Sequence, residues 1–416
     1  MNDGKIKVGI LGGGAAGLFA ACHLKRLSKS SCVDVTILEK KEIPGIKLTL
    51  TGHGRCNITN RKDPSDLKKG FHEAENFIYP ALKEFPPENT ISFFEDELGL
   101  KVKEEDNNRI FPECDSAVTV RDTIVSYLSD FAKTYTGTKV LEIRKPDVFE
   151  VITSTRTFGF DCLILSCGGI SFPKTGSTGD SYKIAEESGH TVIPVRGALA
   201  PVKADRDSSK FTSALSGVSV TAKASIYTDG KMNSSVTGDI LFADFGLTGP
   251  AIMELSREIP SEIKDDTYIE LDFVPSLNEE QLDQEIQKLI RDHADTKIAN
   301  MLNCFCPVSL ANEICKKSGV SGLYAQGFTK ENRKKLCRGL KHLKIKIDAP
   351  VSFDKAYVTR GGVSLKEIDR KTMESKLISG LYIIGEALDI DGISGGYNLQ
   401  ACMSEAYLAA KHILSK

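Results

Sequence analysis

The sequence predicts an α/β protein, a Rossmann-like nucleotide-binding domain interrupted by an insertion of a different kind. Three observations predict this fold. Residues 5–40 contain a strand, a glycine-rich turn, a helix and a second strand, which is the order of a βαβ unit. Residues 381–412 return to a strand, a glycine turn and a helix. Between these segments, short alternating runs and then helical periodicity indicate an all-β part followed by a helical part.

Length and charge bound the class of protein. A chain of 416 residues is too long for one ordinary core and predicts two or three domains. The net charge of −2 gives no overall basic field, so we expect no nucleic-acid partner and no membrane partner. The first residues show no basic head, apolar run and cleavage site, so we expect no signal peptide, and no apolar run approaches the roughly 18 residues that a membrane span needs. We therefore expect a cytoplasmic protein.

The first strand, residues 5–11, ends in the spacing Gly12-x-Gly14-x-x-Gly17, and an apolar helical pattern follows. In this context Gly12 permits a tight turn, Gly14 lets the backbone approach a pyrophosphate, and Gly17 lets helix and strand pack closely. The next strand ends near Glu39. A carboxylate there accepts hydrogen bonds from ribose hydroxyls and disfavours the 2′-phosphate of NADP. The sequence therefore predicts a dinucleotide site at this turn.

The other elements of the predicted nucleotide-binding domain are short. Helical patterns cover residues 88–98 and 116–132. Strand patterns cover residues 139–145, 148–154, 156–160 and 161–169. The first three of these strands predict a meander. The last is nearly all apolar, which is typical of a strand buried on both faces of a parallel sheet.

The insertion changes character along its length. Its first part alternates apolar and polar residues in short bursts separated by Gly, Pro, Ser and Asp, the pattern of an antiparallel barrel or sandwich. Its second part is helical, and the basic run of its last helix is interpreted as a solvated face because acidic stretches lie nearby. We predict three domains: residues 1–190 with 354–416, residues 191–275 with 343–353, and residues 276–342.

The C-terminal segment favours a flavin over a nicotinamide as the bound dinucleotide. A strand ends at GEALD, residues 385–389, and GGYN, residues 395–398, opens the last helix. An acid at such a strand end can bind ribityl hydroxyls. The helix N-terminus can direct amides and positive dipole at the flavin N1–C2=O, where negative charge gathers on reduction. The glycine pair at residues 168–169 is either a further contact or an ordinary turn.

Eleven cysteines occur without a C-x-x-C pair, which in a cytoplasmic chain indicates free thiols. Cys304 and Cys306 lie closest together, but no second pair completes a zinc ligand set, so we predict no metal. Cys56, in the run GHGRCNITN, has no other cysteine within ten residues, which argues against a disulfide reductase. Two interpretations stay open: a thiolate favoured by Arg55, or a small group packed beside a flavin.

Several runs, in order and spanning nearly the whole chain, carry a resemblance: ILGGGAAGLFAA, GRCNITN, RIFPECDSA, LILSCGGISFPKTGSTGD, LFADFGLTGPAIMELS, YVTRGGVSL and GLYIIGEALDIDGISGGYNLQ. With them the chain resembles the BaiN-like bacterial flavoproteins, also known as aminoacetone-oxidase-type FAD-binding enzymes. The resemblance implies a Rossmann-like FAD-binding domain of the two-dinucleotide-binding type, interrupted by an antiparallel β-barrel and a small helical domain. It also implies an FAD- and NAD(P)H-dependent reductase; the best-known activity of the family reduces steroid-ring double bonds of bile-acid conjugates.

The glycine turns and the resemblance together predict the cofactor contacts. The turns themselves indicate Gly14, Gly17 and Gly396. The resemblance implies Gly12, Ala15, Ala16, Glu39, Lys40, Arg55, Cys56, Asn57, Gly168, Gly169, Gly385, Glu386, Asn398 and Leu399, with Val140 holding adenine through its backbone. Two places depart from the family pattern: Ala243-Asp244 stand where Thr-His is common, so any role of that His is absent, and His53 stands where glycine is frequent.

The predicted chemistry is hydride transfer through FAD to an unsaturated small-molecule acceptor. No second glycine fingerprint provides a separate nicotinamide domain, so NAD(P)H, as a transient electron donor, is expected to enter the flavin cleft in turn with the substrate. His53 and Tyr397 are the candidate catalytic residues, as proton donors, with a structural role as the alternative for each.

Three other functions stay open at this point. The first is an FAD-dependent oxidase of an amine or hydroxy compound, and the second is a non-catalytic flavin-binding regulator. The third, a flavin-dependent enzyme that modifies RNA, is disfavoured because no basic, aromatic-rich surface signal is present. Substrate identity, nicotinamide preference and oligomeric state receive no prediction.

Overall fold

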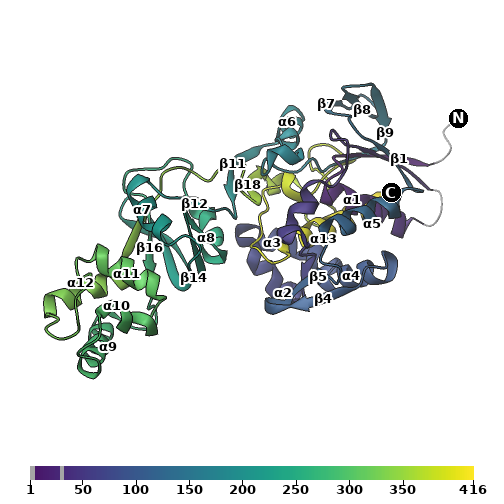
Figure 1. Ribbon diagram of the computed structural model, residues 1–416. Coiled ribbons are helices and arrows are strands. Elements are labelled where there is room, and N and C mark those ends of the chain that lie inside the picture. The colour runs from purple at the N-terminus through teal and green to yellow at the C-terminus, as the bar shows by residue number, and fades with distance from the viewer. Residues whose placement is uncertain (1–4, 29–31) are drawn as a thin grey trace. The chain divides into compact units, whose positions relative to one another are not determined.

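The computed structural model describes residues 5–28 and 32–416. The chain divides into two compact units, and Figure 1 shows their elements. Unit 1 comprises Met1–Gly197 and Tyr357–Lys416, and unit 2 comprises Ala198–Ala356. The two ends of the chain therefore build one unit, and the insertion builds the other.

A five-stranded parallel sheet forms the centre of unit 1, in the order β19-β10-β1-β2-β6. Its strands are β1 (Ile6–Leu11), β2 (Val33–Leu38), β6 (Ala132–Tyr135), β10 (Cys162–Leu165) and β19 (Leu381–Ile383). Every residue of β10 is buried, which confirms the strand buried on both faces. Because β19 pairs with β10, the C-terminal segment extends the sheet begun by the N-terminal one.

Two long apolar helices pack against each other beside this sheet, α1 (Ala15–Leu27) and α13 (Tyr397–Ile413). Both are buried over most of their length, so neither needs a polar outer face. The shorter helices of unit 1 are α2 (Pro64–Leu67), α3 (Glu75–Glu84), α4 (Pro87–Ser92), α5 (Ala117–Leu128) and α6 (Asp180–Glu187). A π-helical turn, Phe93–Glu97, continues α4.

Three small sheets complete unit 1. The meander is confirmed as antiparallel strands β7 (Val140–Arg144), β8 (Phe149–Thr153) and β9 (Thr157–Phe160). A second sheet has the order β3-β5-β4, with β3 (Thr59–Asn60), β4 (Val102–Glu105) and β5 (Arg109–Pro112). The third pairs β11 (Val192–Ala198) with β18 (Val358–Val363).

Unit 2 contains a curled antiparallel sheet in the order β12-β15-β14-β13-β16-β17. An antiparallel bridge between Ala204 and Ile347 joins its two edges, so of the two predicted alternatives, barrel and sandwich, the barrel is the one formed. The strands are β12 (Val202–Lys203), β13 (Ser219–Thr228), β14 (Lys231–Ala243), β15 (Gly246–Thr248), β16 (Tyr268–Asp272) and β17 (Leu343–Lys346).

The helices of unit 2 share one apolar core with this barrel. Two belong to the barrel segment, α7 (Arg206–Ala214) and α8 (Pro250–Leu255). The predicted helical segment contains α9 (Glu279–Asp292), α10 (Ile298–Met301), α11 (Val308–Lys317) and α12 (Lys330–Lys341). A capping box between Asn278 and Gln281 begins α9. The predicted boundary at residue 276 between two separate domains stays a prediction.

The part of the chain that the structure describes contains neither a candidate membrane span nor a candidate metal cluster. Within residues 5–28 and 32–416, no helix has the length and apolar character of a membrane span. The same described residues contain no cluster of three His, Cys, Asp or Glu side chains arranged to hold a metal ion.

Candidate functional site

The predicted contacts gather at one edge of the parallel sheet. Gly12 follows β1, Glu39 follows β2, Gly168 and Gly169 follow β10, and Gly385 follows β19. Because the four strands are parallel, these positions all lie at the carboxyl edge. In open α/β sheets this edge is where ligands bind.

The turn between β1 and α1 needs each of its three fingerprint glycines for a different reason. Gly12 has a φ of +102°, and a Cβ there would lie 2.7 Å from the Cα of Cys167. A Cβ at Gly17 would lie 2.0 Å from the carbonyl oxygen of Gly12, so α1 and β1 approach as closely as only glycine allows. A Cβ at Gly14 has the carbonyl oxygen of Ser166, at 4.0 Å, as its nearest neighbour. The backbone at Gly14 therefore faces open space.

Glu39 is buried beside this turn. Its Oε2 accepts a hydrogen bond from the Gly13 amide and its Oε1 accepts one from the Lys41 amide, each at 2.8 Å. These amides fix the carboxylate next to the fingerprint, as ribose recognition requires. The ammonium of Lys40 is paired with Asp180 at 2.5 Å, so its predicted contact with FAD stays a prediction.

The backbone next to Glu39 leads to the predicted adenine contact. The Thr138 amide donates to the carbonyl oxygen of Glu39 at 2.9 Å, and Val140 begins β7 two residues later, buried. Gly168, with a φ of +74°, has the Ser177 hydroxyl 3.5 Å from its Cβ position. These segments therefore surround the carboxyl ends of β2 and β10.

The two helices that begin at the predicted cofactor turns, α1 and α13, have no side-chain cap at their N-termini. The N-cap of α1 is Gly14 and that of α13 is Gly396, and neither first turn contains an acidic residue. The amides of both first turns, including those of Ala15 and Ala16, can therefore bind negative charge on a ligand. One such terminus at the glycine fingerprint and a second at the C-terminal turn fit the pyrophosphate and the flavin N1–C2=O of FAD.

The GRCN and GGYN runs meet in space. With its amide oriented so that both groups have partners, Asn57 accepts from the Gly396 amide at 3.1 Å and donates to the carbonyl oxygen of Thr59 at 3.1 Å. A Cβ at Gly396 would lie 2.4 Å from that carbonyl group. Asn398 exchanges hydrogen bonds with Gly392, at 2.8 and 2.9 Å. The two asparagines therefore hold the turn that begins α13, and half-buried Leu399 packs on the core behind it.

Cys56 is a packed thiol in this loop. Burial raises its pKa to about 12. The Arg55 guanidinium donates to Glu105 at 2.7 and 3.1 Å and to Asp115 at 3.3 Å, over the ring of Phe111. The structure therefore does not support the interpretation in which Arg55 favours a Cys56 thiolate, because the cation is committed to two carboxylates and the thiol is desolvated. Whether either residue contacts FAD stays a prediction.

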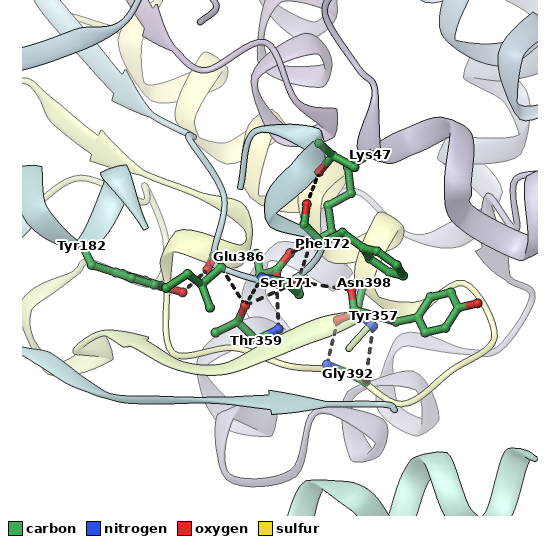
Figure 2. Close-up of polar contacts among 11 residues, drawn as sticks. Lys47, Ser171, Phe172, Tyr182, Tyr357, Thr359, Glu386, Gly392 and Asn398 are labelled. Atoms are coloured by element: carbon green, nitrogen blue, oxygen red, sulfur yellow. Dashed lines mark hydrogen bonds and ion pairs between the residues drawn. The ribbon is translucent and has the colours of Figure 1, made fainter. Parts of the chain in front are cut away.

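A polar cluster surrounds Glu386 (Figure 2). Its Oε1 accepts from the Ser171 hydroxyl at 2.5 Å and from the Thr359 amide at 2.7 Å. Its Oε2 accepts from the Lys47 ammonium at 2.5 Å, and Lys47 also donates to Ser171 at 2.5 Å. Sequence analysis predicted Glu386 but missed Lys47, Ser171 and Thr359. A lone charge in the otherwise uncharged run GIKLTLTG was the one available signal for Lys47.

Of the predicted glycines, Gly169 packs on this cluster and Gly385 lies next to it in the chain. A Cβ at Gly169 would lie 2.4 Å from the Thr359 hydroxyl and 2.9 Å from Glu386. A Cβ at Gly385, whose φ is +69°, would lie 2.7 Å from the Cβ of Ala16. The Gly385 amide donates to buried Glu405 at 2.5 Å, and burial raises the pKa of that carboxyl to about 8. The strand end before Glu386 thus packs between the start of α1, at Ala16, and the middle of α13, at Glu405.

The two predicted proton donors differ in position. His53 is exposed, with a φ of +57°, and its ring lies 6.4 Å from that of Tyr357, which packs 5.3 Å from Phe172 next to Ser171. These aromatic residues border the Glu386 cluster, and Figure 2 shows the Phe172 and Tyr357 rings beside it.

Tyr397 belongs to the core instead. It is 2% exposed, its ring packs 5.8 Å from Phe71, and its hydroxyl accepts a hydrogen bond from Lys62 at 3.0 Å. This position gives Tyr397 a packing role and does not support the prediction that it is a proton donor.

Comparison with known proteins agrees with this geometry. The sequence model described as HI0933-like protein Rossmann domain matches residues 6–412. A 3-dehydro-bile acid delta(4,6)-reductase from Clostridium scindens is 31% identical over 414 residues, covering 97% of this chain and 98% of that protein. A ribosomal RNA dihydrouridine synthase from Haemophilus influenzae is 32% identical over 419 residues, covering 97% of each.

Among solved structures, 3-ketosteroid delta1-dehydrogenase from Sterolibacterium denitrificans aligns with a TM-score of 0.51 and 11% identity, covering 99% of this chain and 100% of that one. At this identity the likeness concerns the fold alone. The family match over nearly the whole length and the reductase relative agree with two uncapped helix N-termini at the carboxyl edge of a parallel sheet. The chain belongs to the HI0933-like Rossmann family and is an FAD-dependent oxidoreductase.

Proposed function

We propose that the protein is an NAD(P)H-dependent reductase that saturates a carbon–carbon double bond conjugated to a carbonyl in a small molecule. The observation that carries the proposal is the uncapped start of α13, held by Asn57 at Gly396. Such a terminus stabilises the negative charge of a reduced flavin. The 31% identical relative is named as a reductase of bile-acid double bonds, which supports the choice of acceptor.

The reaction adds two hydrogens. Bound FAD would supply hydride transfer from NAD(P)H to one carbon of the double bond, and the other carbon would take up a proton. Residues of the chain would do the rest: the first-turn amides of α1 and α13 would hold the cofactor, and the Glu386 cluster would fix the strand end beside it. The proton donor that we propose is His53, which is exposed beside Tyr357 at the border of the Glu386 cluster.

The first test is anaerobic titration of the FAD-loaded protein with NADH and NADPH. We expect either nicotinamide to bleach the flavin, and an enone then to restore its colour with stoichiometric saturated product by mass spectrometry. His53→Gln should slow the acceptor step and leave bleaching unchanged, whereas His342→Gln, an exposed histidine of unit 2, should change neither. A flavin bleached by an amine and not by a nicotinamide would refute the proposal in favour of an oxidase.

Although sequence analysis disfavoured an RNA substrate, the basic residues of unit 2 favour a second acceptor, uridine in ribosomal RNA. Residues 316–346 contain ten lysines and arginines and one acidic residue, Glu331. Lys334, Arg338, Lys344 and Lys346 of this segment are exposed. Dihydrouridine is uridine with its ring double bond saturated, so the chemistry is the same, and the H. influenzae relative is named for it. Such a basic segment supports binding of a phosphate backbone.

This alternative predicts its own result. Changing Lys334 and Arg338 together to Glu should abolish dihydrouridine formation in purified ribosomal RNA and leave enone reduction unchanged. Changing exposed Lys231, on β14, to Glu serves as the matched control. Nucleoside mass spectrometry measures the product. If the native protein reduces enones but leaves the RNA unmodified, the acceptor is the small molecule.

A further inference from the structure

The cation of the Glu386 cluster has no part in the function described so far. Lys47 begins the short helical segment Lys47–Gly54, ahead of the GRCN run. Its ammonium lies 2.5 Å from Glu386 Oε2, and the two side chains are 24% and 20% exposed. An ion pair this shielded from water is stronger than one on an open surface.

Four separate segments of the chain meet at this pair, as Figure 2 shows. Ser171, Thr359 and Glu386 each belong to a different one, and Lys47 donates to two of them. Two of the four segments also carry predicted FAD contacts, at Gly169 and Glu386. Without Lys47, the half-buried carboxylate would keep its Ser171 and Thr359 donors but lose its positive partner.

We propose that Lys47 is a positioning residue of the flavin site: it orients Glu386 toward the cofactor, and its positive charge makes the bound flavin easier to reduce. Reduction adds negative charge to the flavin, so a fixed cation beside the acid that binds it stabilises the reduced form. Glu386 acts with the opposite sign. The inference rests on FAD binding alone, independently of the nicotinamide and the acceptor.

The opposite signs provide the test. In FAD-loaded protein, Lys47→Met should shift the equilibrium toward oxidised flavin by about tenfold, which lowers the midpoint potential of a two-electron couple by about 30 mV. Glu386→Gln should raise the potential, since it leaves the cation uncompensated. Lys47→Arg keeps the charge and should restore the native potential. Lys174→Met removes an exposed lysine three residues after Ser171 and should change nothing.

The measurements are anaerobic equilibration with reference dyes for the potential and flavin fluorescence titration for the FAD dissociation constant. We expect Lys47→Met also to weaken FAD binding. If the ion pair were purely structural, the midpoint potentials of Lys47→Met and Glu386→Gln would shift in the same direction or would not shift at all. That result would overturn the inference. If Lys47→Met retains no FAD, the midpoint potential of Glu386→Gln is the deciding measurement. An unchanged or lowered potential in Glu386→Gln would refute the inference. Native protein that binds no FAD would instead refute the cofactor site itself.

Discussion

The two halves of the cofactor site are built in different ways. The turn between β1 and α1 is local, because Gly12, Gly14 and Gly17 lie within six residues and each has a steric task that the spacing encodes. The Glu386 cluster joins residues that are up to 339 positions apart, such as Lys47 and Glu386. The first half is fixed by backbone geometry and the second by side-chain charge and hydrogen bonding.

This difference separates two kinds of sensitivity. Where half of a site is built from close backbone contacts, an added side-chain atom causes a steric clash. The clash destabilises the fold as much as it weakens binding. Where the other half is built from a few polar side chains, a substitution removes one interaction and the fold around it persists. Substitutions in the two halves should therefore have distinguishable effects on stability and on FAD affinity.

The largest effect is expected within the glycine turn. Gly17→Ala places a Cβ 2.0 Å from the Gly12 carbonyl oxygen, so α1 must move off β1, at a cost of at least about 3 kcal/mol in unfolding free energy. Gly14→Ala meets open space at a φ of −77°, so it should fold normally and lose FAD. Urea unfolding and flavin titration measure the two. Equal stability of both variants would contradict the assignment of their roles.

The next effect concerns Glu405, which links the two halves through the Gly385 amide. Burial raises the pKa of its carboxyl from 4.5 to about 8, so the folded protein keeps a proton that the unfolded chain loses. This contribution to stability is complete below about pH 4.5 and is lost as the pH rises to about 8.

Glu405→Gln, which mimics the protonated acid, should remove that loss. Its unfolding free energy in urea should equal that of the native protein near pH 4.5 and exceed it increasingly toward pH 8. Glu84→Gln, on the exposed end of α3, controls for loss of an acid elsewhere. A difference between Glu405→Gln and the native protein that does not change with pH would show that Glu405 is ionised in the fold.

The same contrast explains what sequence analysis could predict. The βαβ opening, the meander, the fully buried β10 and the last helix follow from local periodicity, and each is present. Sheet β3-β5-β4, α3 and α6–α8 were missed because short, mixed segments take their structure from tertiary packing. For the site, glycine positions could be predicted since their tasks are local, whereas Lys47 could not, because its partner Glu386 is far along the chain.

Cys56 tests whether the GRCN loop belongs to the packed half of the site. Its pKa of about 12 leaves a thiolate fraction on the order of 10⁻⁴ at pH 8. Iodoacetamide should therefore modify exposed Cys114 and spare Cys56, as peptide mass spectrometry would record. Cys56→Ala should cost about 1 kcal/mol of stability and keep FAD-dependent activity. If iodoacetamide modified Cys56 as fast as Cys114, Cys56 would be a reactive thiol.

The smallest effect is expected at Tyr397, whose hydroxyl bonds Lys62 while its ring fills the core. Tyr397→Phe keeps the ring and removes one partly exposed hydrogen bond, so stability should fall by about 0.5 kcal/mol. Acceptor reduction should stay within about twofold of the native rate, with the same pH profile. A much slower acceptor step, with flavin bleaching by the nicotinamide unchanged, would make the hydroxyl a proton donor. It would also mean that the protein rearranges around α13 when the acceptor binds.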